Sequence, residues 1–331
     1  MFINNLPKQD NTLVGERGLN GGIWVKADRR QNAWSTSKKC GPARRYEVQG
    51  RKWIVDHRNH NKNDSLKKGP HTQSPQSWET PPINVALESG EIHIWRASLR
   101  LEPLTHQSLH HTLSEDEKKR ADKFHFEKDK VNFIAARGLL RNILSRYLDT
   151  PADRLAFSSN TYGKPHLANE QRPNLLKFNM SHSGDLALYA IARALEVGID
   201  IEQWREHIAE EDIAERFFSS DEVTALRSLP KHLQKEAFFK CWAGKEAYIK
   251  ARGKGLSLPL KAFTVSLALG ESASLVFEKD RSLDSTSWSI RSLDAGPGYS
   301  AALVVKGSNA LIKCWQWKDL SPKLQTRSGE D

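Results

Sequence analysis

Two acidic residues on one short apolar stretch are the first feature of the sequence that could do chemistry. If the stretch 197–202 is a strand, its three branched apolar residues lie on one face, and Asp200 and Glu202 lie together on the other. Neighbouring carboxylates repel each other, and a divalent cation that prefers oxygen ligands relieves the repulsion. The spacing therefore indicates a Mg²⁺ site, whose ligands Mn²⁺ would also accept. A strand whose polar face meets solvent has the same spacing and remains the alternative.

A third carboxylate comes from a long helix predicted over 231–250. Trp242, Glu246 and Lys250 are four residues apart, so they share one stripe of that helix. Glu246 would complete the metal site and Lys250 would place a cation beside it, a combination that neutralises a diphosphate during group transfer. The alternative is an ordinary Glu–Lys pair on an exposed helix. Gly253 follows, either as a helix C-cap or as a point where backbone approaches a ligand closely.

A third group of side chains offers hydrogen-bond donors to a phosphate. Lys164 lies in a Tyr-Gly-Lys-Pro turn, and Ser181 and His182 lie at the end of a predicted strand. A serine hydrolase is disfavoured because adjacent strand residues point to opposite faces and no Gly-x-Ser-x-Gly motif surrounds Ser181. A zinc site is disfavoured because His182 has no His or Cys partner at ligand spacing.

Helix and strand signals alternate through the part of the chain that must position these groups. Ser114 and Glu117 have the spacing of a capping box at the start of a helix. Hydrophobic periodicity predicts further helices over 128–148, 208–218, 220–228 and 231–250, and strands over 92–95, 155–158, 178–181, 186–192, 197–202, 263–269, 275–277, 288–292 and 300–305. The fold class that follows is α+β, with two similar halves over 88–194 and 195–320 and a short tail over 321–331.

The beginning of the chain differs from the rest in composition. Residues 1–85 carry 15 Lys and Arg against 7 Asp and Glu, and they contain few apolar side chains. Such a segment cannot bury enough surface to offset chain entropy, so we expect a basic extension over 1–87 that is disordered or loosely attached. A nucleic-acid-binding arm is the alternative, because Trp24, Trp34 and Trp53 interleave with the basic residues. No nucleic-acid-binding motif accompanies the charge, which favours a solvated tail.

Several classes of protein are disfavoured by the composition. No run approaches the roughly 18 consecutive apolar residues of a membrane span, and the first residues lack the basic-then-apolar order of a signal peptide. The three cysteines, at 40, 241 and 314, fit neither a disulfide framework nor a Cys-rich zinc site. We therefore expect a cytoplasmic protein with no membrane association.

Taken together and in order, these motifs resemble those of the surfactin-type (Sfp-type) 4′-phosphopantetheinyl transferases. The matching segments are 162–165, 178–183, 197–202, 216–218, 242–250 and 253–257, and the resemblance runs from about 91 to about 305. The family moves the phosphopantetheine arm of coenzyme A to a serine of an apo carrier protein and releases adenosine 3′,5′-bisphosphate. The resemblance implies a transferase fold of two halves, with coenzyme A and Mg²⁺ held in the cleft between them.

The resemblance also implies roles for individual residues. Asp200, Glu202 and Glu246 would hold Mg²⁺ on the coenzyme A diphosphate. Glu246 would further accept the proton of the carrier serine, directly or through water, and Lys250 would stabilise charge on the diphosphate. The nucleotide and its phosphates would be contacted by Lys164, Ser181 and His182.

The family grips the 3′-phosphate of coenzyme A with basic residues near its first helical region. The corresponding stretch here offers Lys118, Lys119 and Arg120, and Arg137 lies in an Ala-Arg-Gly stretch that is similar to one in related transferases. The partners implied are apo acyl or peptidyl carrier domains of fatty-acid, polyketide or nonribosomal-peptide systems, which would dock an acidic helix on Lys and Arg. We expect a monomer.

Two other functions remain as alternatives. A nucleic-acid-binding protein with an inactive transferase-like domain predicts salt-dependent binding that is lost with residues 1–85. A Mg²⁺-dependent phosphohydrolase with the same carboxylates predicts breakdown of coenzyme A in the absence of any carrier protein.

Overall fold

The computed structural model describes residues 45–48, 51–54, 76–168, 176–206, 212–265, 275–278, 288–307 and 310–318. The chain divides into two units, one of Met1–Asn4 with Pro75–Asp331 and one of Asn5–Ser74. In the smaller unit, β1 (Arg45–Val48) and β2 (Arg51–Ile54) form an antiparallel pair. The remainder of the predicted extension before residue 76 lies outside the described residues, as does the predicted tail over 321–331.

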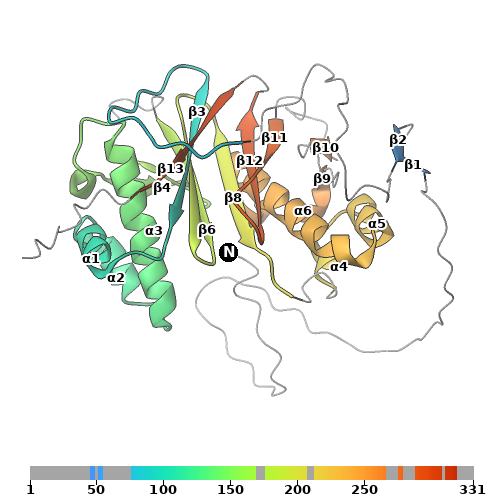
Figure 1. The fold of residues 1–331 in the computed structure, drawn as a ribbon, viewed down its shortest axis with the longest axis horizontal. Helices are drawn as coiled ribbons and strands as arrows, with labels where there is room; N and C mark the ends of the chain where they lie inside the picture. Colours follow the sequence, from blue (N-terminus) through green and yellow to red (C-terminus); the bar gives the residue numbers. More distant parts are fainter. Residues whose placement is uncertain are drawn as a thin grey trace, which may run out of the picture. The chain divides into compact units, whose positions relative to one another are not determined.

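Three helices follow the first strand of the larger unit, β3 (Glu91–Ser98) (Figure 1). They are α1 (Pro103–His111), α2 (Glu115–Ala121) and α3 (Glu127–Ser145). The predicted capping box is confirmed, because the Ser114 hydroxyl accepts the Glu117 N–H and the Glu117 carboxylate accepts the Ser114 N–H. The long helix predicted over 128–148 corresponds to α3.

A four-stranded sheet lies against α3. Its order is β13 (Leu311–Gln316), β3 (Glu91–Ser98), β7 (Leu186–Ala192) and β6 (Lys177–Ser183). The pairings are antiparallel except that of β13 with β3, which is parallel. A short antiparallel pair, β4 (Phe157–Ser159) and β5 (Pro165–Leu167), follows a 3₁₀ turn over Ala152–Arg154.

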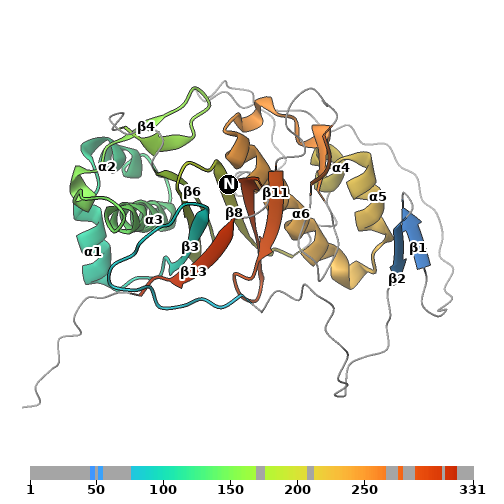
Figure 2. The same cartoon turned by 90° about the horizontal axis from the view of Figure 1, so that it is seen from above.

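The C-terminal part of the unit contains a second sheet and a long helix. The sheet has the antiparallel order β11 (Trp288–Leu293), β12 (Tyr299–Lys306) and β8 (Val197–Gln203). Helices α4 (Ile213–Phe217) and α5 (Ser220–Ser228) precede the long helix α6 (Lys231–Arg252). After α6, two 3₁₀ turns over Gly255–Ser257 and Leu260–Ala262 lead to an antiparallel pair of strands, β9 (Phe263–Val265) and β10 (Leu275–Glu278). The predicted α+β class is confirmed. Both views place α1–α3 and α6 on opposite sides of the strands (Figures 1 and 2).

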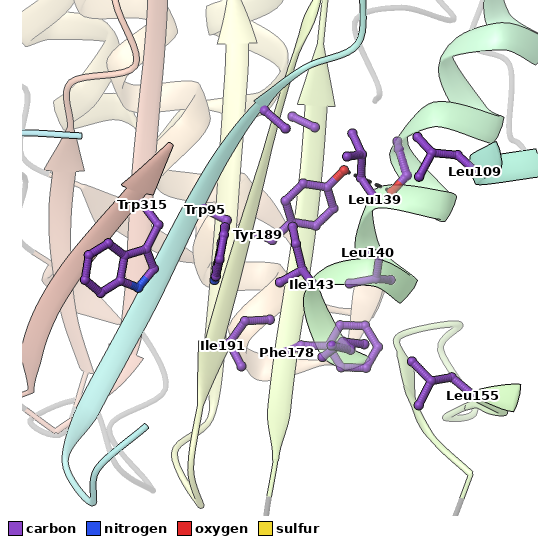
Figure 3. Close-up of a cluster of buried hydrophobic side chains, with 14 of the residues drawn as sticks. Trp95, Leu109, Leu139, Leu140, Ile143, Leu155, Phe178, Tyr189, Ile191 and Trp315 are labelled. Atoms are coloured by element: carbon purple, nitrogen blue, oxygen red, sulfur yellow. Dashed lines mark hydrogen bonds between the residues drawn. The ribbon is translucent and has the colours of Figure 1, made fainter. Parts of the chain in front are cut away.

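The first hydrophobic core joins α3 to the four-stranded sheet (Figure 3). Leu139 and Ile143 of α3 pack with Trp95 of β3, and the Tyr189 hydroxyl donates a hydrogen bond of 2.9 Å to the Ala136 carbonyl. Val85 and Leu87 also belong to this core. The last residues of the predicted extension are therefore packed, and sequence composition did not reveal it because these apolar residues are sparse in a polar stretch.

A second core spans the two sheets. Ile92 and Leu188 of the four-stranded sheet pack with Ile199 and Ile201 of β8 and with Leu303 of β12. Strands β6 and β8 lie side by side here, and no backbone pairing joins the two sheets among the described residues. We call the contact of β6 with β8 the seam. None of the described helices has the length and apolar character needed to cross a membrane.

Candidate active site

Strand β8 carries the two carboxylates that the alternating pattern places on one face. Ile199 and Ile201 contact the second core, whereas Asp200 and Glu202 are fully buried on the opposite face. The antiparallel ladder pairs Asp200 with Ala302 and Glu202 with Ser300 of β12. The alternative of a solvent-facing polar strand is excluded, because neither carboxylate is exposed.

Helix α6 brings the third carboxylate against this face. It packs on β8 and β12, and Glu246 is 7% exposed. The close approach depends on Gly198, since an added Cβ there would overlap the Ala247 carbonyl and the Ala251 amide nitrogen of the helix. An exposed Glu–Lys pair is therefore excluded as well. After α6, Gly253 is a left-handed C-cap (φ 63°) whose N–H donates to the Ile249 carbonyl.

Lys250 is one turn beyond Glu246 and reaches the same place. Its ammonium group donates to Asp200 Oδ1 at 2.6 Å and to Ser181 Oγ at 2.8 Å. Burial opposes the charged form, but the negative charges of Asp200 and Glu246 outweigh it and raise the pKa of Lys250 above its ordinary value. Lys250 is therefore a cation bound among carboxylates.

Three carboxylates surround the single ammonium group of Lys250, and burial together with this excess of negative charge raises the pKa of two of them. Burial, followed by the charge of Asp200, raises the pKa of Glu246 to about 7. The same two causes raise the pKa of Glu202 above its ordinary value. The charge of Asp200 therefore acts on both Glu202 and Glu246.

Two oxygens of this cluster lack partners. Asp200 Oδ2 and Glu246 Oε1 are buried without a hydrogen bond, which normally costs free energy unless a ligand satisfies them. Within the described residues, no three His, Cys, Asp or Glu side chains are already arranged to hold a metal ion. The donor set nevertheless fits a hard divalent cation, because it consists of buried, mutually repelling carboxylate oxygens.

Side chains of β6 line the seam at every second position. Ser181 Oγ donates to Asp200 Oδ1 at 2.8 Å, and Ser183 Oγ donates to Glu202 Oε2 at 3.0 Å. Asn179 Oδ1 accepts the Ile199 N–H at 2.8 Å. Of these three residues, the motif analysis singled out only Ser181. The polar residues at 179, 181 and 183 were a visible signal, because residues two apart on a strand share a face.

His182 and Lys164 lie close to these groups but make different contacts. Burial, with the nearby charge of Lys250, lowers the pKa of His182 to about 4, so its ring is neutral at pH 7. Lys164 donates to the carbonyls of Val197 (3.0 Å) and Ala251 (3.3 Å) and pairs with Glu196 at 3.6 Å. The structure thus places Lys164 between the start of β8 and the end of α6.

The basic residues of the first helices form a separate group. Lys118 pairs with Glu115 at 2.8 Å, Lys119 and Arg120 are exposed on α2, and Arg137 of α3 forms an ion pair with Glu117. The contacts of the described residues do not join any of these four side chains to the carboxylates of β8.

A second buried charge site meets α6 at the residue before Glu246. Lys245 donates to Glu222 Oε2 (2.8 Å) and to the carbonyls of Leu260 (2.8 Å) and Phe263 (2.7 Å). Glu222 also accepts the N–H groups of Ser219 and Val265, both at 2.7 Å. We call these residues the Glu222–Lys245 site. Every ammonium proton and both carboxylate oxygens have partners in it.

Two family models match the chain on either side of Leu195. The model of the 4′-phosphopantetheinyl transferase superfamily matches residues 196–304. A model of the N-terminal part of 4′-phosphopantetheinyl transferases matches residues 101–193. Together the two matches cover helices α1–α3, strands β6 and β7 of the four-stranded sheet, the seam, α6 and most of the second sheet, whereas β3 and β13 lie outside them.

Curated relatives agree with the family models. The chain is 36% identical over 241 residues to the 4′-phosphopantetheinyl transferase HetI of Nostoc sp., an alignment covering 73% of this chain and 98% of the relative. It is 32% identical over 193 residues to Sfp of Bacillus subtilis, covering 58% and 81%. It is 37% identical over 163 residues to psf-1 of Bacillus pumilus, covering 49% and 67%.

Proposed function

The chain belongs to the 4′-phosphopantetheinyl transferase superfamily and is a transferase enzyme, and from that premise we propose its reaction. It transfers the 4′-phosphopantetheine group of coenzyme A to a serine hydroxyl of an apo acyl or peptidyl carrier protein. The serine oxygen forms a bond to the β-phosphorus, the bond from that phosphorus to the bridging oxygen breaks, and adenosine 3′,5′-bisphosphate leaves with that oxygen.

The observation that carries the proposal is the buried cluster of Asp200, Glu202 and Glu246 with Lys250 bound to it. Asp200 Oδ2 and Glu246 Oε1 are buried without partners, which supports a ligand at this place. Mg²⁺ is the cation that we assign, and Mn²⁺ satisfies the same oxygen ligands. When bound, the cation would neutralise negative charge on the diphosphate and polarise its oxygens.

Glu246 and Lys250 then have distinct tasks. A carboxyl group whose pKa is about 7 is partly ionised at neutral pH, which suits Glu246 as the acceptor of the serine proton, directly or through water. Lys250 keeps its proton in this environment. Its ammonium would stabilise the negative charge that grows on the leaving diphosphate oxygen.

The nucleotide end of coenzyme A is assigned to residues on both sides of the seam. Ser181 and His182 of β6 are adjacent to Lys250 and would contact the phosphates. Lys164 would contact the nucleotide from the turn before β5, beside the end of α6. For the 3′-phosphate, the candidates are Lys118, Lys119, Arg120 and Arg137; the first three lie on α2, and Arg137 would have to share its guanidinium with Glu117.

The carrier protein completes the proposal. An acidic carrier helix would be attracted to exposed Lys and Arg of this chain, which accelerates encounter more than it strengthens binding. We propose that the enzyme acts as a monomer in the cytoplasm, with the domain limits 88–194 and 195–320 for its two halves.

Intact-mass spectrometry of an apo carrier domain tests the proposal. Incubation with the protein, coenzyme A and Mg²⁺ should add one phosphopantetheine group to the carrier, and a chelator should abolish the gain until Mg²⁺ is restored. Breakdown of coenzyme A at the same rate without a carrier would instead indicate a phosphohydrolase. Several apo carriers left unmodified by folded protein would contradict the transferase proposal, and salt-dependent DNA binding would then favour the nucleic-acid alternative.

A further inference from the structure

We propose that Ser183, aided by Asn179, is a positioning residue that holds the carboxylates of β8 in place for the cation. The inference rests on the proposed function, because it concerns how the carboxylates of Glu202 and Asp200 are oriented toward the proposed cation. Neither residue is one to which we assigned contact with metal, nucleotide or reacting atoms.

The seam lacks the backbone ladder that normally fixes one strand against the next. On its other side, β8 is paired with β12 along its whole length. Toward β6, no backbone pairing occurs among the described residues, and the seam is joined by side chains. The position of β8 relative to β6 therefore depends on those side-chain hydrogen bonds.

Ser183 joins two points of β8 at once. Its hydroxyl donates to Glu202 Oε2 at 3.0 Å and accepts the Gln203 N–H at 3.0 Å. Ser183 is 2% exposed and Glu202 is fully buried. A hydroxyl has one proton to donate, and Ser183 donates it to Glu202. This hydrogen bond fixes the orientation of the Glu202 carboxylate.

Asn179 holds the other end of the seam. Its Oδ1 accepts the Ile199 N–H, the residue before Asp200, at 2.8 Å. Without that acceptor, the Ile199 N–H would be a buried donor in need of a partner. Ser181 lies between Asn179 and Ser183 and bonds Asp200 in the same way. The three side chains thus form a ladder that substitutes for backbone pairing next to both carboxylates.

Groups that orient metal ligands are known to alter metal affinity by roughly 10–100-fold when they are removed. Ser183→Ala and Ser183→Cys both remove the strong hydroxyl donor, and Cys retains most of the volume. We expect each variant to bind Mn²⁺ roughly 10-fold more weakly. Asn179→Ala should also weaken Mn²⁺ binding. Ser183→Thr keeps the hydroxyl and should bind Mn²⁺ with the affinity of the wild type.

Ser300→Ala is the matched control. Ser300 is also a buried serine, 8% exposed, and it lies opposite Glu202 on β12. Its hydroxyl accepts the indole N–H of Trp204 at 2.9 Å. Removing this hydroxyl alters packing beside β8 but leaves the seam intact, so Mn²⁺ affinity should stay within about twofold of the wild type.

The experiment is a Mn²⁺ titration of the full chain with coenzyme A, followed by electron paramagnetic resonance, with thermal unfolding to verify that each variant is folded. The KM for Mg²⁺ should rise in Ser183→Ala while kcat at saturating Mg²⁺ changes little. If the wild type binds Mn²⁺ and both Ser183 variants bind it equally well, the positioning inference is overturned while the proposed function stands. Equal loss in Ser300→Ala also overturns it. A wild type without a Mn²⁺ site contradicts the proposed function itself.

Discussion

Helix α6 meets two buried acidic sites at neighbouring residues, and the sites differ in how completely their charges are satisfied. At Lys245, the three ammonium protons have three acceptors, and both oxygens of Glu222 accept hydrogen bonds. At Glu246, three carboxylates share one lysine, and two buried oxygens have no partner. The side chains of both sites are buried to a similar extent, so the sites differ in how many of their polar atoms have hydrogen-bond partners.

Saturation separates a structural role from a functional one. A buried ion pair whose hydrogen-bonding capacity is filled has no capacity left for a ligand, and removal of one member leaves a buried charge alone. A cluster with excess negative charge and unpartnered oxygens is destabilised, and a bound cation relieves it. The Glu222–Lys245 site therefore fastens α5 and β9 to α6. For the carboxylates of the seam, we propose that they bind the ligand and react.

Lys245→Met should produce the largest loss of stability. It leaves Glu222 buried without its counter-ion, which typically costs about 3–5 kcal/mol. Urea unfolding measures this as a lower unfolding midpoint. The double variant Glu222→Gln/Lys245→Met removes the lone charge and should recover part of the loss. Equal stability of the single and double variants would mean that the site is not a coupled pair.

Lys250→Met should act mainly on the reaction. The variant lacks the cation that we place beside the diphosphate, and we expect transfer to slow by roughly 100-fold, as for removal of one electrostatic stabiliser. Lys254→Met is the matched control, because Lys254 is exposed just beyond the helix end. Steady-state transfer rates at saturating coenzyme A provide the comparison, and equal rates in the two variants would remove Lys250 from the mechanism.

Gly198→Ala should affect both stability and activity. The new methyl group overlaps the α6 backbone at Ala247 and Ala251, and overpacking of this kind costs about 1–3 kcal/mol. Because the helix must move away from β8, the folded variant should also transfer more slowly. Gly138→Ala makes a smaller overlap, with Leu109 of α1, away from β8 and α6. It should lose stability alone, and equal loss of activity in both would argue against a local effect.

The smallest expected effect is a change in the pH dependence of stability at Glu117, another buried carboxylate. Burial would raise its pKa, but the charge of Arg137 and the hydrogen bonds from the Ser114 N–H, Arg137 and Arg141 together outweigh burial, so the pKa lies below its ordinary value of 4.5. Its ionised form therefore stabilises the fold at pH values above 4.5, and this contribution disappears as the pH falls through the lowered pKa. The stability gap between wild type and Glu117→Gln, measured by urea unfolding, should narrow from pH 7 toward pH 4. A gap that widens would contradict the assignment.

Local patterns were sufficient to predict some features. The alternation over 197–202 put Asp200 and Glu202 on one face because strand periodicity is a local property. The capping box at Ser114 was predicted for the same reason. The shared stripe of Glu246 and Lys250 follows from helix periodicity alone, and both side chains reach the same cluster in the structure.

Features that depend on distant parts of the chain were not predictable. Burial of Asp200 is decided by α6, which Gly198 allows to approach, so the strand pattern alone left a solvent-facing alternative. The acceptors of Lys164 include a carbonyl at Ala251, far along the chain. Strand β13 is absent from the predicted elements, because its parallel partner β3 lies far earlier in the sequence. The role of Glu222 likewise depends on Lys245, which belongs to another helix.

The most direct test of the account is the rate of phosphopantetheine transfer by Glu246→Gln, followed by intact mass of an apo carrier, with urea unfolding of the same sample. Removing a proton acceptor and a repelling charge should slow transfer by roughly 1,000-fold without lowering the free energy of unfolding. Transfer at the wild-type rate, or a loss of stability as large as that of Lys245→Met, would contradict the claim that the unsaturated carboxylates are the reacting site.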